Sequence, residues 1–434
     1  MIRNLEELVD NGGTKFGKER RDALEILDGV LEKMNGYNLV KSSLKIENGF
    51  MHIKGRKINL LAHKKIFVVG FGKASASMAK AIEEMMDVDG GMVISTEDIE
   101  LRKIENVKGS HPLPDRKNVE ATEKLVDIVK NADEEDLIIV LISGGGSSLL
   151  CMPIVSLNAM RDVSQELMRK GCTIEELNVV RKHISRVKGG RLASMSRAKM
   201  ISLIISDIIG NPLESISSGP TVADSSTFED AMEVLDKYGV KNEEVRNFIE
   251  RGIRGEVEET PSRLSNVENF IIGDISMACR LALEMAEERG YNARIVSTSI
   301  SGEAREMGAN LAKYAIFHPR ERIIFIGGGE TTVTVEGEGK GGRNQEMVLG
   351  AIKEIAGEPV VFLSCGTDGI DGNSPAAGAI ADGESLARAK KLGLSPATFL
   401  ENNDSYAFFE RMGDAIITGY TGTNVMDIQI IIKK

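Results

Sequence analysis

Two glycine-rich runs contain the residues best suited to hold an anion. Ser143–Ser148 (Ser-Gly-Gly-Gly-Ser-Ser) follows the apolar run Leu137–Ile142, and Gly327–Thr332 (Gly-Gly-Gly-Glu-Thr-Thr) follows the apolar run Ile323–Ile326. A glycine run at the carboxyl end of a parallel strand lets backbone N–H groups point at an anion, and the N-terminus of a following helix adds its positive dipole end. The two runs therefore predict phosphate or carboxylate chemistry between two α/β halves.

The first run gives the stronger prediction. Its three glycines permit an anion-binding nest, and its last two serines can cap the next helix and donate to phosphate oxygens. A plain turn and a nucleophilic serine are the alternatives, although the Gly-x-Ser-x-Gly elbow of such a serine is missing. The residues expected to hold a nucleotide phosphate are Gly144, Gly145, Gly146, Ser147 and Ser148.

A glycine turn that ends in a lysine occurs at Gly70-Phe71-Gly72-Lys73, where an apolar run leads into Gly-x-Gly. A dinucleotide fingerprint would need its third glycine at Ser75, and the spacing of a Walker A loop is also absent. One interpretation is a tight strand–helix turn. The functional interpretation places Lys73 where a phosphate or a developing negative charge would sit.

The segment Leu177–Ser206 carries seven Lys or Arg residues and no acidic residue, although the protein as a whole is acidic. A solvated basic helix is one interpretation and an anion site is the other. Lys188 and Gly189 favour the anion site, because adjacent glycines allow the backbone to approach a ligand. His183 lies in the same segment, where a packing role and a catalytic role are equally compatible with the sequence.

Carboxylates follow predicted strands in both halves. Asp207 comes directly after Ile201–Ser206, and Asp368 and Asp371 come after Val360–Ser364. Mg²⁺ bound with nucleotide phosphates typically uses one or two carboxylates and keeps several waters, so Asp207 and Asp368 are candidate metal ligands. Helix capping and a plain Asp-Gly turn are the alternatives.

The run Gly341-Gly342-Arg343-Asn344-Gln345 opens a predicted helix and presents three polar side chains together. Arg343 could clamp a carboxylate or phosphate with two hydrogen bonds. Asn344 is expected to contact the cofactor. A surface hairpin loop is the alternative, but such a loop would not need this polar set.

The composition excludes several classes of function. The excess of 65 Asp and Glu over 54 Lys and Arg argues against general nucleic-acid binding. The four cysteines are far apart and form no CxxC pair, which argues against a zinc site and a disulfide framework. Cys365 is either a nucleophile or a buried apolar residue. Neither a signal peptide nor an apolar run of about 20 residues occurs, so we expect a cytoplasmic protein that does not interact with membranes.

The elements that must position these residues alternate between short apolar runs and amphipathic stretches. Such alternation predicts an α/β protein with mostly parallel sheets covered on both faces. A helix is expected over Asp115–Asn131, and a strand over Thr331–Val335 is expected to pair antiparallel with its neighbour. The domains are predicted as 1–250 and 262–434, with the boundary in the polar stretch Thr227–Ser265. The other predicted strands are Lys65–Phe71, Gly91–Ser95, Leu137–Ile142, Ile201–Ser206, Phe270–Gly273, Arg294–Thr298, Arg322–Gly327, Val360–Ser364 and Ile428–Ile432.

Taken in order, these segments resemble the glycerate 2-kinase family that carries a C-terminal MOFRL region. The motifs that carry the resemblance are Gly70–Ala74, Ser110–Asp115, Ser143–Ser148, Arg181–His183, Lys188–Gly190, Ser206-Asp207, Ser218–Thr221, Gly341–Glu346, Gly366–Gly369 and Thr421–Asn424. Asn211, where many relatives would have an acidic residue, and the turn Asn373-Ser374-Pro375 depart from the family pattern. These departures weaken a metal assignment at their own positions.

The resemblance implies a two-domain α/β enzyme with a Rossmann-like N-terminal domain, a MOFRL-type C-terminal domain and an active site in the interdomain cleft. It implies transfer of a phosphoryl group from ATP to the 2-hydroxyl of D-glycerate, with Mg²⁺ or another divalent cation, and Lys73 and Arg343 as catalytic residues. We expect the Ser143–Ser148 run to bind the cofactor, together with Lys188, Gly189 and Asn344. Homo-oligomerisation is left open. The alternatives are a nicotinamide-dependent reductase of hydroxypyruvate or tartronate semialdehyde, and a non-catalytic sensor.

Overall fold

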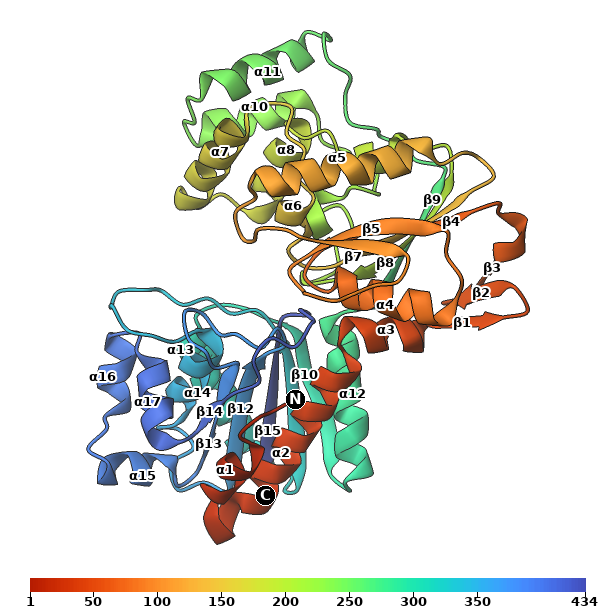
Figure 1. Cartoon of the computed structure of the whole chain (residues 1–434). Helices are drawn as coiled ribbons and strands as arrows, with labels where there is room; N and C mark the ends of the chain where they lie inside the picture. Colours follow the sequence, from red (N-terminus) through yellow and green to blue (C-terminus); the bar gives the residue numbers. More distant parts are fainter. The chain divides into compact units, whose positions relative to one another are not determined.

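The chain alternates strands and helices and folds into two structural units, each with its own six-stranded sheet (Figure 1). The computed structural model describes all residues from Met1 to Lys434. One unit comprises Gly36–Ile272, and the other combines Met1–Asn35 with Gly273–Lys434. We call them the Lys73 unit and the Arg343 unit, after one candidate residue in each.

The Lys73 unit contains a six-stranded sheet in the order β6-β5-β4-β7-β8-β9. Its strands are β4 (Ile66–Phe71), β5 (Gly90–Ser95), β6 (Ile104–Lys108), β7 (Leu137–Ile142), β8 (Lys199–Ile205) and β9 (Val267–Gly273). The pairs from β6 to β8 are all parallel. Counted within this sheet, the order is 3-2-1-4-5-6, the order of the Rossmann fold.

Burial and helix capping explain these elements. Every residue of β7 is buried, as expected for a parallel strand covered on both faces. The predicted helix is confirmed as α5 (Arg116–Asn131), and Asp115 caps it by accepting from the amides of Lys117 and Asn118. Figure 1 draws α4 (Ser75–Met85) below the sheet and α5 above it.

The rest of the Lys73 unit consists of helices and a small antiparallel sheet. Four helices form a separate apolar cluster around Phe228 and Leu177: α7 (Leu157–Arg169), α8 (Ile174–His183), α10 (Phe228–Lys237) and α11 (Glu243–Ile253). The small sheet contains β1 (Leu44–Glu47), β2 (Phe50–Ile53) and β3 (Arg56–Asn59). The remaining helices are α3 (Gly36–Ser43), α6 (Gly146–Leu149) and α9 (Arg191–Ser194), with short 3-10 turns at Leu60–Ala62 and Ile216–Ser218.

The Arg343 unit contains a mixed sheet in the order β10-β11-β15-β12-β13-β14. Its strands are β10 (Asn292–Ile300), β11 (Ile323–Gly329), β12 (Val360–Gly366), β13 (Gly378–Asp382), β14 (Ala415–Ile416) and β15 (Asp427–Lys433). Only β10 and β11 pair in parallel, because the last strand of the chain inserts between β11 and β12 in the opposite direction. The expected mostly parallel arrangement is therefore found in the first sheet, whereas the second is mixed.

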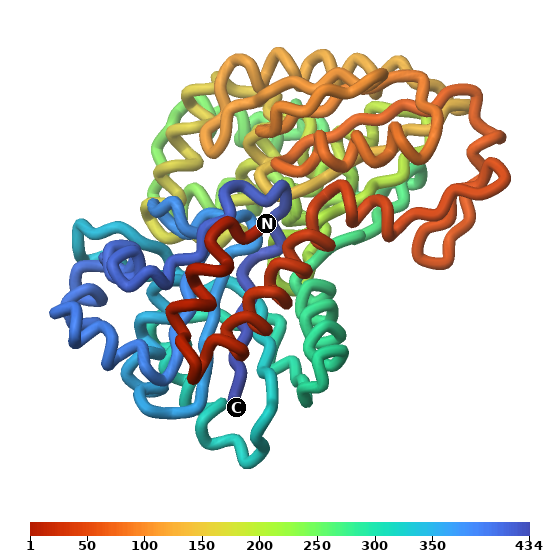
Figure 2. The backbone as a smooth tube through the Cα atoms, turned by 60° about the horizontal axis from the view of Figure 1, so that its bottom comes forward, coloured from red at the N-terminus to blue at the C-terminus, as the bar shows by residue number.

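The N-terminal helices belong to the Arg343 unit, although the sequence predicted residues 1–250 as one domain. Arg20 is fully buried in α2 (Gly13–Lys33) and contacts Asp382 and Asp414, with Nε–Oδ2 at 2.7 Å and Nη1–Oδ1 at 2.7 Å. Figure 2 shows this N-terminal segment beside the C-terminal strand. Conversely, β9 completes the sheet of the Lys73 unit, although it falls in the predicted range 262–434.

Helices surround the mixed sheet. They are α1 (Leu5–Asp10), α2, α12 (Ile275–Glu288), α13 (Ala304–Phe317), α14 (Arg343–Ala351), α15 (Ser385–Lys391), α16 (Pro396–Glu401) and α17 (Ser405–Met412). None of the helices has the length and apolar character needed to cross a membrane.

Two predictions in this unit are wrong. Gly327–Gly329 is not a loop but the end of β11, paired with β15. A Cβ on Gly328 would lie 2.4 Å from a carbon of Ile275, so glycine is needed there for packing and not for an anion nest. Thr331–Val335 is an extended loop and not a strand. Its only ladder contact is a parallel bridge from Thr332 to Glu303, whose carboxylate also accepts from the amide of Thr334.

Candidate active site

The loops after β4 and β7 meet at the point where the strand order of the parallel sheet reverses. The amide of Lys73 donates to the Gly144 carbonyl at 2.9 Å, and the amide of Ala74 donates to Ser143 Oγ at 3.0 Å. In open α/β sheets, ligands bind outside the carboxyl ends of the strands at such a switch point. The structure thus brings two of the predicted motifs, far apart in the sequence, into one site.

The Ser143–Ser148 run turns sharply into the short helix α6. Gly145 has φ of +83°, and a Cβ there would lie 3.0 Å from the ring of His111. The hydroxyls of Ser147 and Ser148 already have partners: Ser147 Oγ lies 3.0 Å from Ser218 Oγ, and Ser148 Oγ donates to the Pro112 carbonyl at 2.6 Å. The amides of Gly146 and Ser148 also donate within the run, to the carbonyls of Ser143 and Gly145, so the amides of Gly144, Gly145 and Ser147 are the candidate donors to an anion.

Lys188 and Gly189 support this loop from within. Lys188 is 3% exposed, and its Nζ donates to the carbonyls of Ser147 at 2.7 Å and Leu150 at 3.1 Å. Burial lowers the pKa of Lys188 to about 7. The amide of Gly189 donates to the Ser218 carbonyl at 3.0 Å. Both residues hold the loop in place and do not present their own groups to a ligand.

Asp207 stands directly after β8, as the sequence indicated. It is partly buried, and burial raises the pKa of its carboxyl to about 6 while the charge of Lys73 partly opposes that effect. Asp207 and Lys73 are therefore within electrostatic reach of each other. A perturbed carboxyl beside a lysine, at the carboxyl end of a parallel sheet, is typical of a functional site.

Three residues near these loops were missed as individual candidates. His111 belongs to the Ser110–Asp115 motif, and its ring lies against Gly145. Ser218 links α8 to the loop by donating to Asn178 Oδ1 at 2.9 Å. Glu97 follows β5, and its carboxylate accepts from the Ser77 amide at 3.0 Å. Its position at the end of the second strand was the signal that could have found it.

Arg343 is the first residue of α14, in the other unit. Its Nε and Nη2 donate to the two carboxylate oxygens of Asp427 at 2.5 and 2.9 Å, and its Nη1 lies 2.7 Å from Glu330 Oε1. Burial acts to lower the pKa of Arg343, but the two carboxylates raise it on balance. The guanidinium is 34% exposed, whereas Asp427 beneath it is 1% exposed. Arg343 is thus a fixed cation with an outward-facing edge.

Asp371 fixes the beginning of α14. Its carboxylate accepts from the amides of Asn344 at 3.0 Å and Gln345 at 2.9 Å, and from the side-chain amide of Gln345 at 2.8 Å. A Cβ on Gly342 would lie 2.3 Å from this carboxyl group, so only glycine leaves room for the cap. Burial raises the pKa of Asp371 to about 6.

Asn344 does not reach the surface. It is 1% exposed, and its Oδ1 accepts from Ser364 Oγ at 2.6 Å. Cys365 follows Ser364 in β12 and is fully buried, and burial raises the pKa of its thiol well above the ordinary value. Of the two interpretations of Cys365, the apolar one therefore fits. Asn344 therefore supports the start of α14, which carries Arg343. It exposes no atom that could contact a cofactor directly.

The candidate metal ligands Asp207 and Asp368 lie in different units. Nowhere in the chain do three or more His, Cys, Asp or Glu side chains come together as a metal site. A single carboxylate is nevertheless compatible with Mg²⁺, which usually completes its shell with substrate phosphates and waters. Asp207, which stands next to the Gly144 loop, fits this description.

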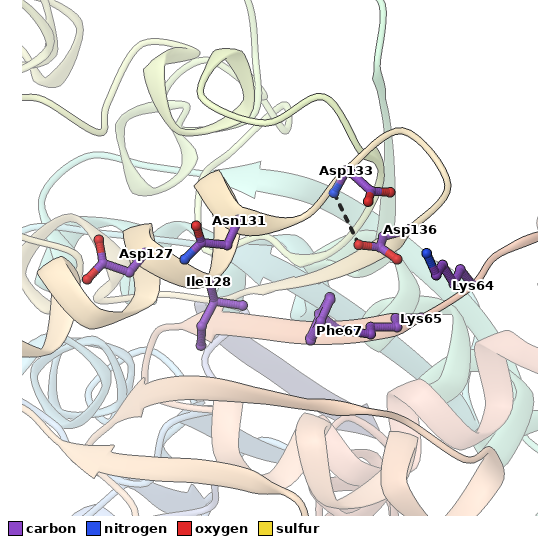
Figure 3. Close-up of a pocket in the computed structure, with 8 residues that line it drawn as sticks. All are labelled: Lys64, Lys65, Phe67, Asp127, Ile128, Asn131, Asp133 and Asp136. Carbon is purple, nitrogen blue, oxygen red and sulfur yellow. Dashed lines mark hydrogen bonds between the residues drawn. The ribbon is translucent and has the colours of Figure 1, made fainter.

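The Lys73 unit also contains a cavity of about 360 Å³, but the position of this cavity argues against its being the active site. Lys65 comes before β4 and Asp136 before β7, so the cavity opens at the amino ends of the strands (Figure 3). Its most buried carboxylate, Asp136, accepts from the amide of Asp133 at 3.1 Å. Ligands of parallel α/β sheets bind at the opposite edge.

Fold and site together define a two-unit α/β protein with a candidate anion site at a Rossmann-type switch point and a clamped arginine on a mixed sheet. Residues 22–250 match the family described as a domain of unknown function, DUF4147, and residues 323–427 match the MOFRL family. The chain is a member of the glycerate kinase family that combines these two regions.

Individual relatives agree with this membership. The chain is 38% identical to glycerate 2-kinase of Pyrococcus horikoshii over 95% of its own length and 97% of the relative's. It is 41% identical to D-glycerate 2-kinase of Thermotoga maritima over 86% and 91%. The crystal structure of a Thermotoga maritima glycerate kinase superposes with a TM-score of 0.86 at 38% identity, covering 96% of this chain and all of the other.

Proposed function

We propose that this protein is a glycerate 2-kinase, which transfers the γ-phosphoryl group of ATP to the 2-hydroxyl of D-glycerate. The observation that carries the proposal is the meeting of Lys73 with the Gly144 loop at the switch point, in a chain of this family. Phosphoryl transfer needs positioning and charge neutralisation more than covalent chemistry. A backbone cradle, a lysine and a clamped arginine supply both.

The roles follow from the contacts of each residue. The backbone of Ser143–Ser148 would hold nucleotide phosphates, with Lys188 keeping the loop in shape. Lys73 would offset the charge on the transferring group, and the outward edge of Arg343 would bind the glycerate carboxylate. Asp207 would hold the divalent cation, which when bound neutralises phosphate charge. We place this activity in the cytoplasm.

One experiment tests the reaction and its regiochemistry. The purified protein is incubated with ATP, Mg²⁺ and D-glycerate, and the products are identified by ³¹P NMR. Formation of 2-phosphoglycerate and ADP is the expected result. Formation of 3-phosphoglycerate would keep the kinase and overturn the position of transfer. If no ADP forms, while NADH is oxidised with hydroxypyruvate, the reductase alternative replaces the kinase.

A further inference from the structure

A cavity of about 530 Å³ adjoins Arg343 within the Arg343 unit. Its walls include Thr331, Val333, Val335, Gly341, Glu346 and Arg343. This volume falls within the usual range of small-molecule sites, which is about 300–1,000 Å³. D-Glycerate is small and polar throughout, so it would leave most of this space and both valines uncovered.

One wall is formed by the backbone of Gly339, Gly341 and Gly342. A Cβ on Gly339 would lie 2.4 Å from the Cβ of Asp404, and a Cβ on Gly341 would lie 2.0 Å from Ser405 Oγ. The glycines therefore pack directly on the segment that begins α17 and carry no side chain into the cavity. Together with the methyl groups of Val333 and Val335, they make a wall suited to a flat apolar face.

This wall does not form a phosphate cradle. The amide of Gly337 donates to Asn403 Oδ1 at 2.9 Å, that of Lys340 to Asp404 Oδ1 at 2.9 Å, and that of Gly341 to Asn373 Oδ1 at 2.9 Å. Because side chains already occupy these donors, little remains for an anion.

The charges around the cavity point in the same direction. Glu330 and Glu346 both line it, paired with Arg343 and Arg305, and the one cation at its edge, Arg343, is already bound by Asp427 and Glu330. The lining therefore offers no unpaired cation to a polyphosphate. A ligand that donates hydrogen bonds would be favoured, since the carboxylates are acceptors.

A buried hydroxyl provides independent evidence for a ligand. Thr331 is 3% exposed and lines the cavity, yet its Oγ1 has no hydrogen-bond partner in the structure. Buried polar groups without partners are rare in native proteins because each costs about 1–3 kcal/mol. A bound ligand with a polar edge would satisfy this hydroxyl.

From these observations, we propose that the cavity binds the purine base of ATP, with a face against Val335 and the glycine wall and a polar edge toward Thr331. The amino group of adenine is a donor, as the acceptor-rich lining requires, and the base is flat and uncharged. The inference rests on the proposed ATP-dependent activity and assigns the base to the Arg343 unit.

Binding measured by calorimetry on the full chain tests the inference, with ADP, adenosine and tripolyphosphate as probes. Val335 is 72% exposed, so Val335→Arg should block the cavity without disturbing the core. Thr331→Val removes the hydroxyl at constant shape. Leu392→Arg is the control, since Leu392 is also an exposed apolar residue of this unit, 56% exposed, and does not line the cavity.

The inference predicts that Val335→Arg weakens ADP and adenosine binding by at least about tenfold, and that Thr331→Val weakens it by about three- to tenfold, the effect of one lost hydrogen bond. Tripolyphosphate binding should not change, and Leu392→Arg should resemble the wild type. Unchanged ADP binding in Val335→Arg, or an equal loss for tripolyphosphate, overturns the base site. If the wild-type protein shows no kinase activity, the proposed function is overturned, whatever the binding results.

Discussion

Arg343 and Asp427 form a two-point ion pair at the first residue of α14, with Nε–Oδ2 at 2.5 Å and Nη2–Oδ1 at 2.9 Å. Asp427 is almost fully buried, so this pair is part of the framework of the site. Nη1, at the other edge of the guanidinium, lies 2.7 Å from Glu330 Oε1, and that glutamate is 45% exposed. Arg343 therefore has a fixed inner edge and an exchangeable outer edge.

Arg343→Lys should lower kcat/KM for D-glycerate by about 100-fold or more. A lysine keeps the positive charge but cannot bind Asp427 and a substrate carboxylate at the same time through a planar fork. Steady-state kinetics with varied glycerate, together with circular dichroism to verify folding, measure the effect. Activity within threefold of the wild type would remove Arg343 from the substrate site.

Glu330→Gln should lower the KM for D-glycerate severalfold. In the structure the Glu330 carboxylate occupies the edge of Arg343 that the glycerate carboxylate would need, and a neutral amide competes less well for a guanidinium. A matched control is Glu338→Gln, which removes a charge from the nearby glycine-rich loop without an ion pair to Arg343. An unchanged or higher KM in Glu330→Gln would show that Glu330 does not compete with the substrate.

Lys73→Met should reduce kcat by about 100-fold or more, because electrostatic stabilisation of a transferring phosphoryl group is a large part of catalysis. Lys65→Met is the control. It lies at the other end of the same strand, at the amino edge of the sheet, and should retain wild-type turnover. Equal activity of the two variants would contradict the role of Lys73.

The sequence predicted the parallel sheet and its switch-point loops well, because local signals determine them. A continuous apolar run such as Leu137–Ile142 specifies a buried strand, and glycines mark its end. The mixed sheet was harder to predict. The glycines of Gly327–Gly329 resemble a loop, but contacts with α12 and β10 require them within a strand. Such contacts are formed by distant segments and leave no local pattern.

The difference between local and distant contacts also explains which candidate residues the sequence could indicate. Lys73, Asp207 and Arg343 could be proposed as candidates because each stands at the end of a strand or the start of a helix. Lys188 and Asn344 were identified by residue type, yet their side chains turn inward and support the site from beneath. Orientation depends on tertiary packing, which spacing along the chain does not reveal.

The affiliation of the N-terminal helices with the Arg343 unit also has a measurable consequence. Arg20 is fully buried between Asp382 and Asp414, so Arg20→Ala removes the buried cation of these two carboxylates and leaves them only the more exposed Arg388. Removing one partner of a buried ion pair costs about 3–5 kcal/mol. Thermal unfolding should show the loss in the transition of this unit. The neighbouring Arg21→Ala, which breaks an exposed pair with Glu6, should leave the transition unchanged.

The raised pKa of Asp207 predicts a stability change with an unusual sign. The carboxyl titrates at about 6 in the folded protein, against about 3.9 in an unfolded chain. As the pH rises from about 4 to 6, the unfolded chain loses this proton first, so the contribution of Asp207 to stability falls by at most about 3 kcal/mol and stays constant above pH 6. Asp207→Asn does not titrate. The difference in unfolding free energy between wild type and variant, from urea titrations across this range, isolates the effect.

A flat difference between wild type and Asp207→Asn would mean that the pKa of the folded carboxyl is not raised above that of an unfolded chain. Mg²⁺ with ADP provides the link to function. A cation bound by Asp207 favours the ionised carboxylate and would move the titration to lower pH, because metal binding displaces the proton. If Mg²⁺ and ADP leave the titration of Asp207 where it was, the cation binds elsewhere, and Asp207 acts on the reaction only through its charge beside Lys73.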